Sequence, residues 1–515
     1  MQRSELPDRI LIAFLLLLIA LGFWLNLHAV PLFDLDEGAF GDATREMLAR
    51  GDYLSTWLYG EPRHDKPILI YWLQALSVNT LGLHEFALRL PSALAATAWV
   101  LAIWWLGERL VGRRAALIAA AITAASLLVL IIGRAATADA LLNLWIAVAM
   151  LAIGVWWRER RTWLILLAHI AIGLGFLTKG PIAVAIPFVV SALFFLGRGE
   201  WRAWLGAVFH PGGLALFLLI ALPWYIAQYL SMGPAFLEGF LLEHNVSRYS
   251  APMHGHAGGY LYYLPVALLA VLPFTTLLLR TLGSPGELWR SPEQRYLLLW
   301  FGFVFVFFSF SGTKLPHYLL YGLSGLFLLM ALRAERLRDG PLLYLPAWLV
   351  FAALLFLPEL LGLVAGHSSD VDVVTALDGY QAHFGLGWRL FFLAAVALTS
   401  WLAFEPRLPA LGKLLGIAAL HSLAIGALLI PVVGQIVQMP MKEAGLLARD
   451  IDAPTVMWRA NQPTFNVYAD RTVERREPEP GDLVFTRSRH LDDLGLSYRE
   501  LYRRGGFSLI HIAKS

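Results

Sequence analysis

The chain has 515 residues, of which 58% are hydrophobic and only 15% are charged, so its composition excludes a soluble globular protein and indicates a membrane protein with several spans. The formal net charge of +3 is too small to indicate a nucleic-acid partner, and we expect none. The absence of cysteine excludes disulfide bonds, thiol nucleophiles and thiolate metal ligands.

The first apolar run, 10–30, is long enough to cross about 30 Å of hydrocarbon. It follows Arg3 and Arg9, and no small-residue cleavage motif comes after it, so we expect a retained first helix rather than a signal peptide. Further apolar segments follow along the chain, and together they predict about thirteen transmembrane helices. These segments lie near 10–30, 86–106, 115–132, 139–157, 162–178, 180–197, 208–230, 260–280, 296–311, 317–333, 341–365, 388–404 and 413–437.

Basic residues divide the connecting loops into two sets that alternate along the chain. The strongly basic set, with "GERLVGRR" and "RAERLR" among its members, is predicted to be cytoplasmic by the positive-inside rule. The other set, with outer loops 31–85 and 231–259, holds most of the unusual His, Asp and Lys residues. We therefore expect a transmembrane domain over 1–438 and a small outer domain over 439–515. In that last segment, "TVMW", "DLVFT" and "FSLIHIA" predict strands of a small α/β domain behind an otherwise all-α polytopic membrane protein.

The first outer loop begins with "PLFDLDEGAFGDATREM", which places five acidic residues directly after the first span. The apolar positions Phe40, Ala43 and Met47 follow helical spacing, and Gly51 suits the end of a short helix. Pro67 suits the first turn of a second helix. Both helices are too short to span the membrane, so we expect them to lie in its interface.

Each polar residue on the outer side also has a simple structural interpretation. A carboxylate such as Asp36, Glu37 or Asp139 caps a helix and complements its dipole. Lys66 suits the headgroup level, and His244 suits an ordinary loop. Their convergence on one face of the bundle favours a site instead. Lysine and arginine bind phosphate, a carboxylate activates a hydroxyl or stabilises a developing positive sugar, and acidic and histidine ligands hold a divalent metal.

The sequence resembles the bacterial aminoarabinose transferases and their protein O-mannosyltransferase-like relatives. The resemblance rests on "DLDEGAF…REM…KPILIYW…RLPSAL" in the first outer loop, followed in family order by "TADALL", "GLGFLTKGPIA", "EHNVSRY" and "SGTKLPHYLL". It is specific over roughly the segment from residue 10 to residue 330. It implies a GT-C fold and an enzyme that takes a sugar from an undecaprenyl-phosphate-linked donor, with inversion, and passes it to a lipid A, lipopolysaccharide or other envelope acceptor. No nucleotide cofactor is expected.

The resemblance also implies roles for individual residues. The first-loop carboxylates Asp36 and Glu37 and the later Asp139 are the expected catalytic residues. The expected donor-phosphate ligands are Lys66, Arg248, Lys314 and Tyr318, and the expected substrate cavity adds Arg134, Tyr71, Lys179 and His317. A structural zinc or similar divalent metal is expected on Asp65, His244 and His256, with aspartate standing where the family has a glutamate.

Two alternatives remain open at this point. One keeps the chemistry but makes a protein hydroxyl the acceptor. The other is a polyprenyl-phosphate transporter, which predicts pseudo-symmetric halves and ionisable groups deep in the bundle. We find no clear internal repeat, and the conspicuous charges lie at outer helix ends. The expected location is the bacterial inner membrane, among membrane lipids, with the active site facing the periplasm.

Overall fold

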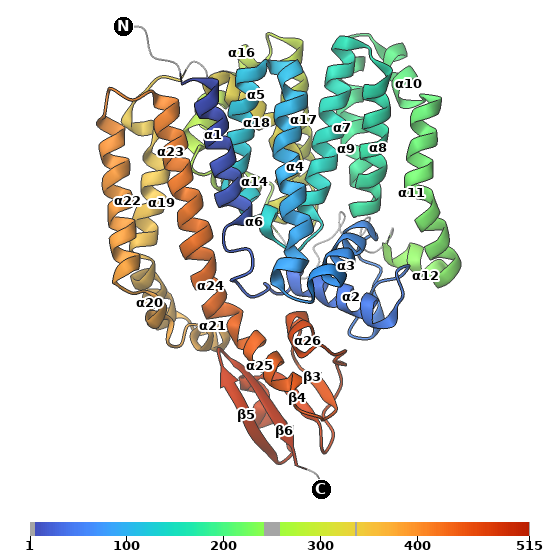
Figure 1. Cartoon of the computed structure of the whole chain (residues 1–515), viewed down its shortest axis with the longest axis vertical. Coiled ribbons are helices and arrows are strands. Elements are labelled where there is room, and N and C mark those ends of the chain that lie inside the picture. Colours follow the sequence, from blue (N-terminus) through green and yellow to red (C-terminus); the bar gives the residue numbers. More distant parts are fainter. Residues whose placement is uncertain (1–5, 241–257, 335–336, 514–515) are drawn as a thin grey trace.

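The computed structural model describes residues 6–240, 258–334 and 337–513. A helical bundle carries a group of short helices at one end, and a small sheet domain lies beyond these helices (Figure 1). The N-terminus lies at the opposite end of the bundle from the C-terminal domain (Figure 1). The predicted fold class is therefore confirmed.

All thirteen predicted segments are helical, although fewer helices meet a strict test for a span. Within the described ranges, seven helices are long and apolar enough to cross a membrane. They are α4 (Glu85–Val111), α7 (Asp139–Glu159), α8 (Thr162–Lys179), α11 (Pro211–Met232), η3 with α18 (Pro316–Ala334), α22 (Leu386–Phe404) and α23 through η6 and α24 (Ala410–Val437).

Two bent helix pairs raise this number to nine if each pair counts as one span. The chain turns by 66° between α5 (Arg113–Ala125) and α6 (Leu127–Arg134), and by 60° between α19 (Leu345–Leu355) and α20 (Leu357–His367). At the first bend Ser126 has an extended backbone, which interrupts the helix. The four other predicted segments form shorter, interrupted or less apolar helices. These are α1 (Asp8–Ile19) with η1 (Ala20–Trp24), α9 (Ile182–Leu196), α14 (Tyr263–Ala270) with α15 (Thr275–Leu282), and α17 (Pro292–Ser309).

The core of the bundle includes side chains of α4, α17 and α18. Trp99 of α4 and Trp300 of α17 are fully buried, and the Trp99 indole donates a hydrogen bond of 2.8 Å to Ser324 of α18. Short helices and turns connect the spans. They are α10 (Trp201–Val208), α12 (Pro234–Leu237), α16 (Pro285–Leu288), η4 (Pro341–Leu343), α21 (Val371–Ala376) and η5 (Tyr380–His383).

The first outer loop contains the two predicted interfacial helices, α2 (Asp36–Arg50) and α3 (Leu69–Leu81). Helix α2 ends at Gly51, whose φ of 66° is the left-handed conformation that glycine adopts without strain. Between the helices lies a two-stranded ribbon of β1 (Trp57–Leu58) and β2 (Glu61–Pro62). Both helices lie at the end of the bundle that faces the C-terminal domain (Figure 1).

The C-terminal domain contains a four-stranded sheet in the order β3-β4-β6-β5. Strand β4 pairs parallel with β3 and antiparallel with β6, so that Val484 lies opposite Ile510. Helices α25 and α26 share one buried cluster with the sheet, which includes Phe465 and Phe485. The bounds are α25 (Met439–Arg449), β3 (Thr455–Trp458), α26 (Pro463–Ala469), β4 (Leu483–Arg487), η7 (Ser488–Asp493), β5 (Tyr498–Arg504) and β6 (Phe507–Ile512). The domain boundary predicted at residue 438 falls between α24 and α25.

Candidate active site

Glu37 anchors the start of the first outer loop to the bundle. Its carboxylate is buried and forms a bidentate pair with Arg89, with nitrogen–oxygen distances of 2.8 and 2.6 Å. The same carboxylate accepts hydrogen bonds from the backbone N–H groups of Ala136 (2.7 Å) and Phe33 (2.8 Å). Because four donors hold it, Glu37 fixes the loop against α4 and against the segment that joins α6 to α7.

The neighbouring Asp36 has a different environment. It is the first residue of α2, its side chain is exposed, and it lines a cavity of about 360 Å³. Buried Arg134 lines the same cavity; one of its Nη atoms donates to the Leu25 carbonyl, and Nη1 has no hydrogen-bond partner within the described protein. The cavity therefore contains both a carboxylate and a guanidinium whose Nη1 is available to donate to a ligand. Its apolar wall includes side chains from α6, η6 and α24: Ile131, Ile132, Leu429, Ile430 and Val433.

Asp139 is the centre of a second polar cluster. Its carboxylate is buried at the start of α7 and contacts Lys179 Nζ at 2.5 Å. The Tyr321 hydroxyl donates to the same oxygen at 3.1 Å, and His317 Nε2 lies 3.8 Å from it. Lys179 also donates to the Tyr321 hydroxyl at 3.0 Å. The predicted residues Asp139, Lys179 and His317 therefore lie together.

A third cluster of charges lies in the first outer loop. Lys66 contacts Asp65 at 2.5 Å, and Arg63 contacts the other oxygen of Asp65 at 3.0 Å. Arg63 also lies over the Phe40 ring, on which the predicted cavity residue Tyr71 stacks with ring centroids 5.4 Å apart. The Tyr71 hydroxyl is buried and has no hydrogen-bond partner in the described part of the chain, and burial raises its pKa to about 12.

The predicted metal ligands do not form a cluster in the part of the chain that the structure describes. No group of three acidic or histidine side chains suitable for a metal occurs among those residues. The Asp65 carboxylate faces the cations of Arg63 and Lys66, which oppose a further cation at its oxygens. His244 and His256 lie outside the described residues. The metal therefore stays a prediction, and no chemical step below depends on it.

The other predicted phosphate ligands have these positions. Arg248 lies outside the described residues. Lys314 is buried and donates to the Ser311 carbonyl at 2.5 Å. Tyr318 is buried one turn before Tyr321, with its ring centroid 4.8 Å from that of Phe308.

Several residues of these clusters were not predicted from the sequence, among them Asp34, Tyr321, Arg63 and Arg89. Asp34 lines the Asp36 cavity and accepts hydrogen bonds from the backbone N–H of Thr464, at 3.1 Å, and from the Thr464 hydroxyl. The pattern "DLDE" could have indicated Asp34, because its two aspartates lie two residues apart where α2 begins. Tyr321 follows Tyr318 by three residues, a spacing that places two helical side chains on one face.

The chain is similar to known membrane glycosyltransferases. The family model described as "Dolichyl-phosphate-mannose-protein mannosyltransferase" matches residues 65–226. The undecaprenyl phosphate-alpha-4-amino-4-deoxy-L-arabinose arabinosyl transferase of Aeromonas hydrophila is 35% identical over 332 residues, which cover 62% of this chain and 59% of that protein. The chain thus aligns with less than two thirds of the length of this relative. The protein of the same name from Pectobacterium carotovorum is 32% identical over 400 residues, 75% of this chain and 70% of that protein.

Solved structures agree on the fold. The crystal structure of ArnT from Cupriavidus metallidurans bound to undecaprenyl phosphate superposes with a TM-score of 0.80 and 18% identity, covering 98% of this chain and 97% of that one. The oligosaccharyltransferase of Archaeoglobus fulgidus superposes less closely, with a TM-score of 0.53 and 14% identity over 91% of this chain and 64% of that one. With the sequence matches, these likenesses establish a multi-pass membrane protein: the chain belongs to the aminoarabinose transferase family of membrane glycosyltransferases with the GT-C fold.

Proposed function

We propose that this protein transfers a sugar from an undecaprenyl-phosphate-linked donor to lipid A or a related envelope glycolipid at the periplasmic face of the bacterial inner membrane. The observation that carries the proposal is the position of Asp36. An exposed carboxylate opens into a cavity that has a largely apolar wall and is also lined by Arg134, whose guanidinium has an unused donor in the described protein. Such a cavity suits two substrates that each combine a polar head with a lipid chain.

The chemistry assigned to these residues is an inverting displacement at the anomeric carbon. An acceptor oxygen forms a bond to that carbon, and the bond from the carbon to the donor phosphate oxygen breaks. The electron pair of the broken bond leaves with undecaprenyl phosphate. If the acceptor oxygen belongs to a hydroxyl, Asp36 receives its proton; if it belongs to an ionised phosphate, Asp36 only orients it.

The leaving phosphate carries negative charge, so cations close to it lower the barrier. Lys66 and Lys179 are candidates for this role, and each is already held by a carboxylate, Asp65 and Asp139. These carboxylates keep the two lysines positioned before the donor arrives. Glu37 acts as a positioning residue through its four hydrogen bonds.

The sugar and the acceptor are finer points of the proposal. The Aeromonas and Pectobacterium relatives are named as transferases of 4-amino-4-deoxy-L-arabinose, so a pentose is the first candidate and a hexose the second. The protein mannosyltransferase description of the matching family model makes a protein hydroxyl the alternative acceptor.

The test is a transfer assay with the purified protein in detergent. Undecaprenyl-phosphate donors of aminoarabinose, mannose, glucose and galactosamine are each offered with lipid A or with a peptide acceptor, and released undecaprenyl phosphate is measured. We expect turnover of one donor with lipid A. We expect Asp36→Asn to lower the rate by about 100-fold or more, because it removes the base or orienting charge.

The matched control is Glu61→Gln, which neutralises an exposed carboxylate of the same loop outside the Asp36 cavity. We expect it to keep the wild-type rate. Full activity in Asp36→Asn would remove the role proposed for that residue. If no donor turned over while labelled undecaprenyl phosphate crossed vesicles with both proteins, a transporter would replace the transferase.

A further inference from the structure

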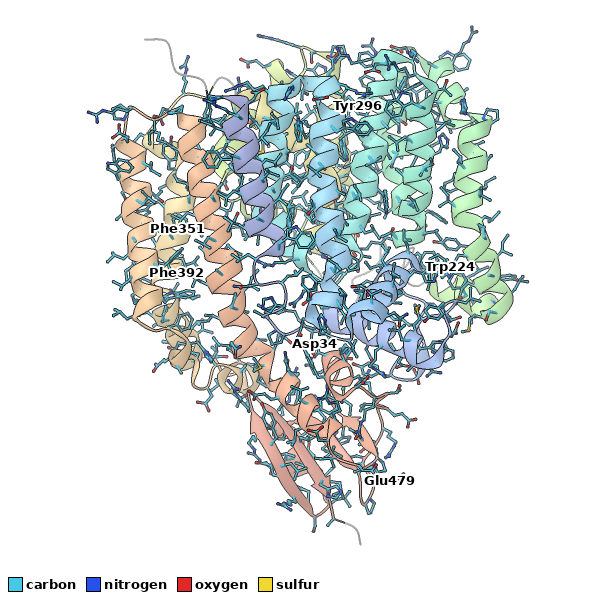
Figure 2. The ribbon with its side chains drawn as sticks, in the orientation of Figure 1. Asp34, Trp224, Tyr296, Phe351, Phe392 and Glu479 are labelled. Carbon is cyan, nitrogen blue, oxygen red and sulfur yellow. The ribbon has the colours of Figure 1, made fainter. Side chains whose placement is uncertain are left out.

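A second, larger cavity lies between the C-terminal domain and the outer end of the bundle. Its volume is about 650 Å³, and its walls come from the loop after β3, the end of β4, α21 and the junction of α24 with α25. Figure 2 shows Asp34 at this junction, between the bundle and the sheet domain. The charged lining consists of three arginines and two aspartates: Arg459, Arg475, Arg487, Asp34 and Asp372.

The ion pairs around this cavity leave an excess of positive charge. Arg487 and Arg489 both contact Asp372, at 2.7 and 2.8 Å, so two cations share one carboxylate. Arg459 contacts Asp493 at 2.7 Å, and both side chains of this pair are about half exposed. The lining therefore favours an anionic ligand.

Among the three arginines that line this cavity, Arg475 is the one best placed to bind a ligand. Its side chain is exposed, and its guanidinium carbon lies 5.5 Å from the ring centroid of Tyr59 in the first outer loop. No carboxylate in the described part of the chain forms an ion pair with it. Stacking on an aromatic ring leaves the in-plane N–H groups of a guanidinium available, and these match two oxygens of a phosphate.

The same cavity also offers an acceptor of hydrogen bonds. Gln462 lines it and is only 8% exposed, and its Oε1 atom is buried with no hydrogen-bond partner among the residues that the structure describes. A buried amide oxygen without a donor is unfavourable, so a ligand hydroxyl at this point would be stabilising. A phosphate would satisfy Arg475, and a sugar hydroxyl would satisfy Gln462.

The two cavities are adjacent because they share a wall. Asp34 lines both the basic cavity and the smaller cavity that contains Asp36 and Arg134. A head group in the basic cavity would therefore adjoin the cavity that contains Asp36, the carboxylate proposed to act on the acceptor. The smaller cavity provides the apolar wall along which a lipid chain can lie.

We propose that the basic cavity binds a phosphate-bearing saccharide head group of the acceptor, with Arg475 on the phosphate and Gln462 on a hydroxyl. This inference rests on the proposed function, since it assigns the acceptor subsite of that transferase. It makes the C-terminal domain part of the substrate site. It also predicts that ionic strength weakens acceptor binding, because the contact is between exposed charges.

The test is direct binding without a donor, so that it does not depend on turnover. The full-length protein in detergent is titrated by calorimetry with a deacylated glucosamine disaccharide phosphate, with the dephosphorylated disaccharide, and with inorganic phosphate. We expect the phosphorylated disaccharide to bind best. We expect Arg475→Gln to weaken its binding by about tenfold or more, and Arg475→Lys, which keeps the charge but not the fork, to weaken it less.

The matched control is Arg499→Gln, an exposed arginine of β5 outside the cavity, which is expected to bind as the wild type does. Equal binding by Arg475→Gln and Arg499→Gln, or equal binding of the two disaccharides, would overturn the inference. Inorganic phosphate binding as tightly as the phosphorylated disaccharide would overturn the saccharide site in favour of a simple phosphate site. Normal transfer with an unchanged acceptor KM in Arg475→Gln would also overturn it and leave the proposed function intact.

Discussion

Asp34 is the carboxylate that connects the two cavities, and its ionisation depends on its surroundings. Burial raises its pKa from 3.8 to about 7, and the charges of Asp42 and Glu37 act in the same direction. The two hydrogen bonds from Thr464 oppose this rise. The folded protein therefore favours the protonated form of Asp34 up to near-neutral pH.

This pKa predicts how stability changes with pH. Because the folded pKa lies above the unfolded one, the contribution of Asp34 is most favourable below about pH 4 and is lost as pH rises to about 7. We expect Asp34→Asn, which imitates the protonated form, to raise the unfolding temperature by a few degrees at pH 8 and to change it little at pH 4.5. Thermal unfolding in detergent checks this, with the exposed Glu61→Gln as control. An equal shift at both pH values would contradict the prediction.

Asp139 and Lys179 form a buried ion pair, so removing one charge leaves the other buried without its partner. We expect Asp139→Asn to destabilise the protein by about 3–5 kcal/mol and to lower the transfer rate at least as much as Asp36→Asn does. Tyr321→Phe removes two hydrogen bonds of 3.1 and 3.0 Å but leaves the ion pair, so it should cost about 1–3 kcal/mol. Unfolding temperatures and initial rates are measured for both variants. A wild-type unfolding temperature in Asp139→Asn would contradict the pair's importance.

At the scale of single residues, the sequence indicated chemical types better than individual roles. The sequence predicted that Asp36 and Glu37 belong to one site, but not that their environments differ. Asp36 faces a cavity, whereas Glu37 accepts hydrogen bonds from four donors. That difference depends on Arg89 and Ala136, which lie about 50 and 100 residues further along the chain. The partnership of Asp34 with Thr464 was equally out of reach, since 430 residues separate them.

At the scale of elements, α26 is the contact that joins the C-terminal domain to the first outer loop. It packs on α2, and its Asn466 donates to Asp42 at 2.8 Å. The Tyr468 hydroxyl donates to Glu85 of α4 at 3.0 Å and accepts from the backbone N–H of Leu32 at 2.8 Å. The C-terminal domain thus holds both ends of the segment that carries Asp36.

This contact predicts that Tyr468→Phe lowers activity from a distance. The change leaves a buried carboxylate and a backbone N–H each short of one hydrogen bond, which costs about 1–3 kcal/mol. We expect a lower unfolding temperature and a several-fold lower transfer rate, because the loop is less firmly held. Tyr502→Phe is the control, since that hydroxyl bonds to Glu443 within the C-terminal domain, at 2.7 Å. Indistinguishable rates for the two variants would contradict the coupling.

Elements with a strong apolar pattern were predicted from the sequence, and elements without one were not. The runs that became β3, β4 and β6 are buried and apolar, so their patterns were readable. Strand β5 was missed because "YRELYRR" is a mostly exposed edge strand, and an edge strand needs no apolar alternation. The bend at Ser126 was also missed, since no proline or glycine marks it.

At the scale of the whole molecule, the two ends of the bundle differ in chemistry. Helices α2 and α3, both cavities and the C-terminal domain lie at one end, and the N-terminus, α10 and α16 lie at the other (Figure 1). The loops at the second end are the strongly basic ones. This separation supports the orientation that the alternation of basic loops predicted, with the site outside the cytoplasm.

The absence of cysteine allows this orientation to be tested with single introduced thiols. Glu479 is an exposed residue of the C-terminal domain (Figure 2). Arg161 lies between the end of α7 and the start of α8, the ends of these helices opposite to those that carry Asp139 and Lys179, and its side chain is 66% exposed. We expect a membrane-impermeant maleimide to label Glu479→Cys in intact spheroplasts, and to label Arg161→Cys only after permeabilisation. The wild-type protein gives the background, since it has no thiol. The reverse pattern would place the Asp36 cavity on the cytoplasmic side, where the proposed transfer to an outer acceptor could not occur.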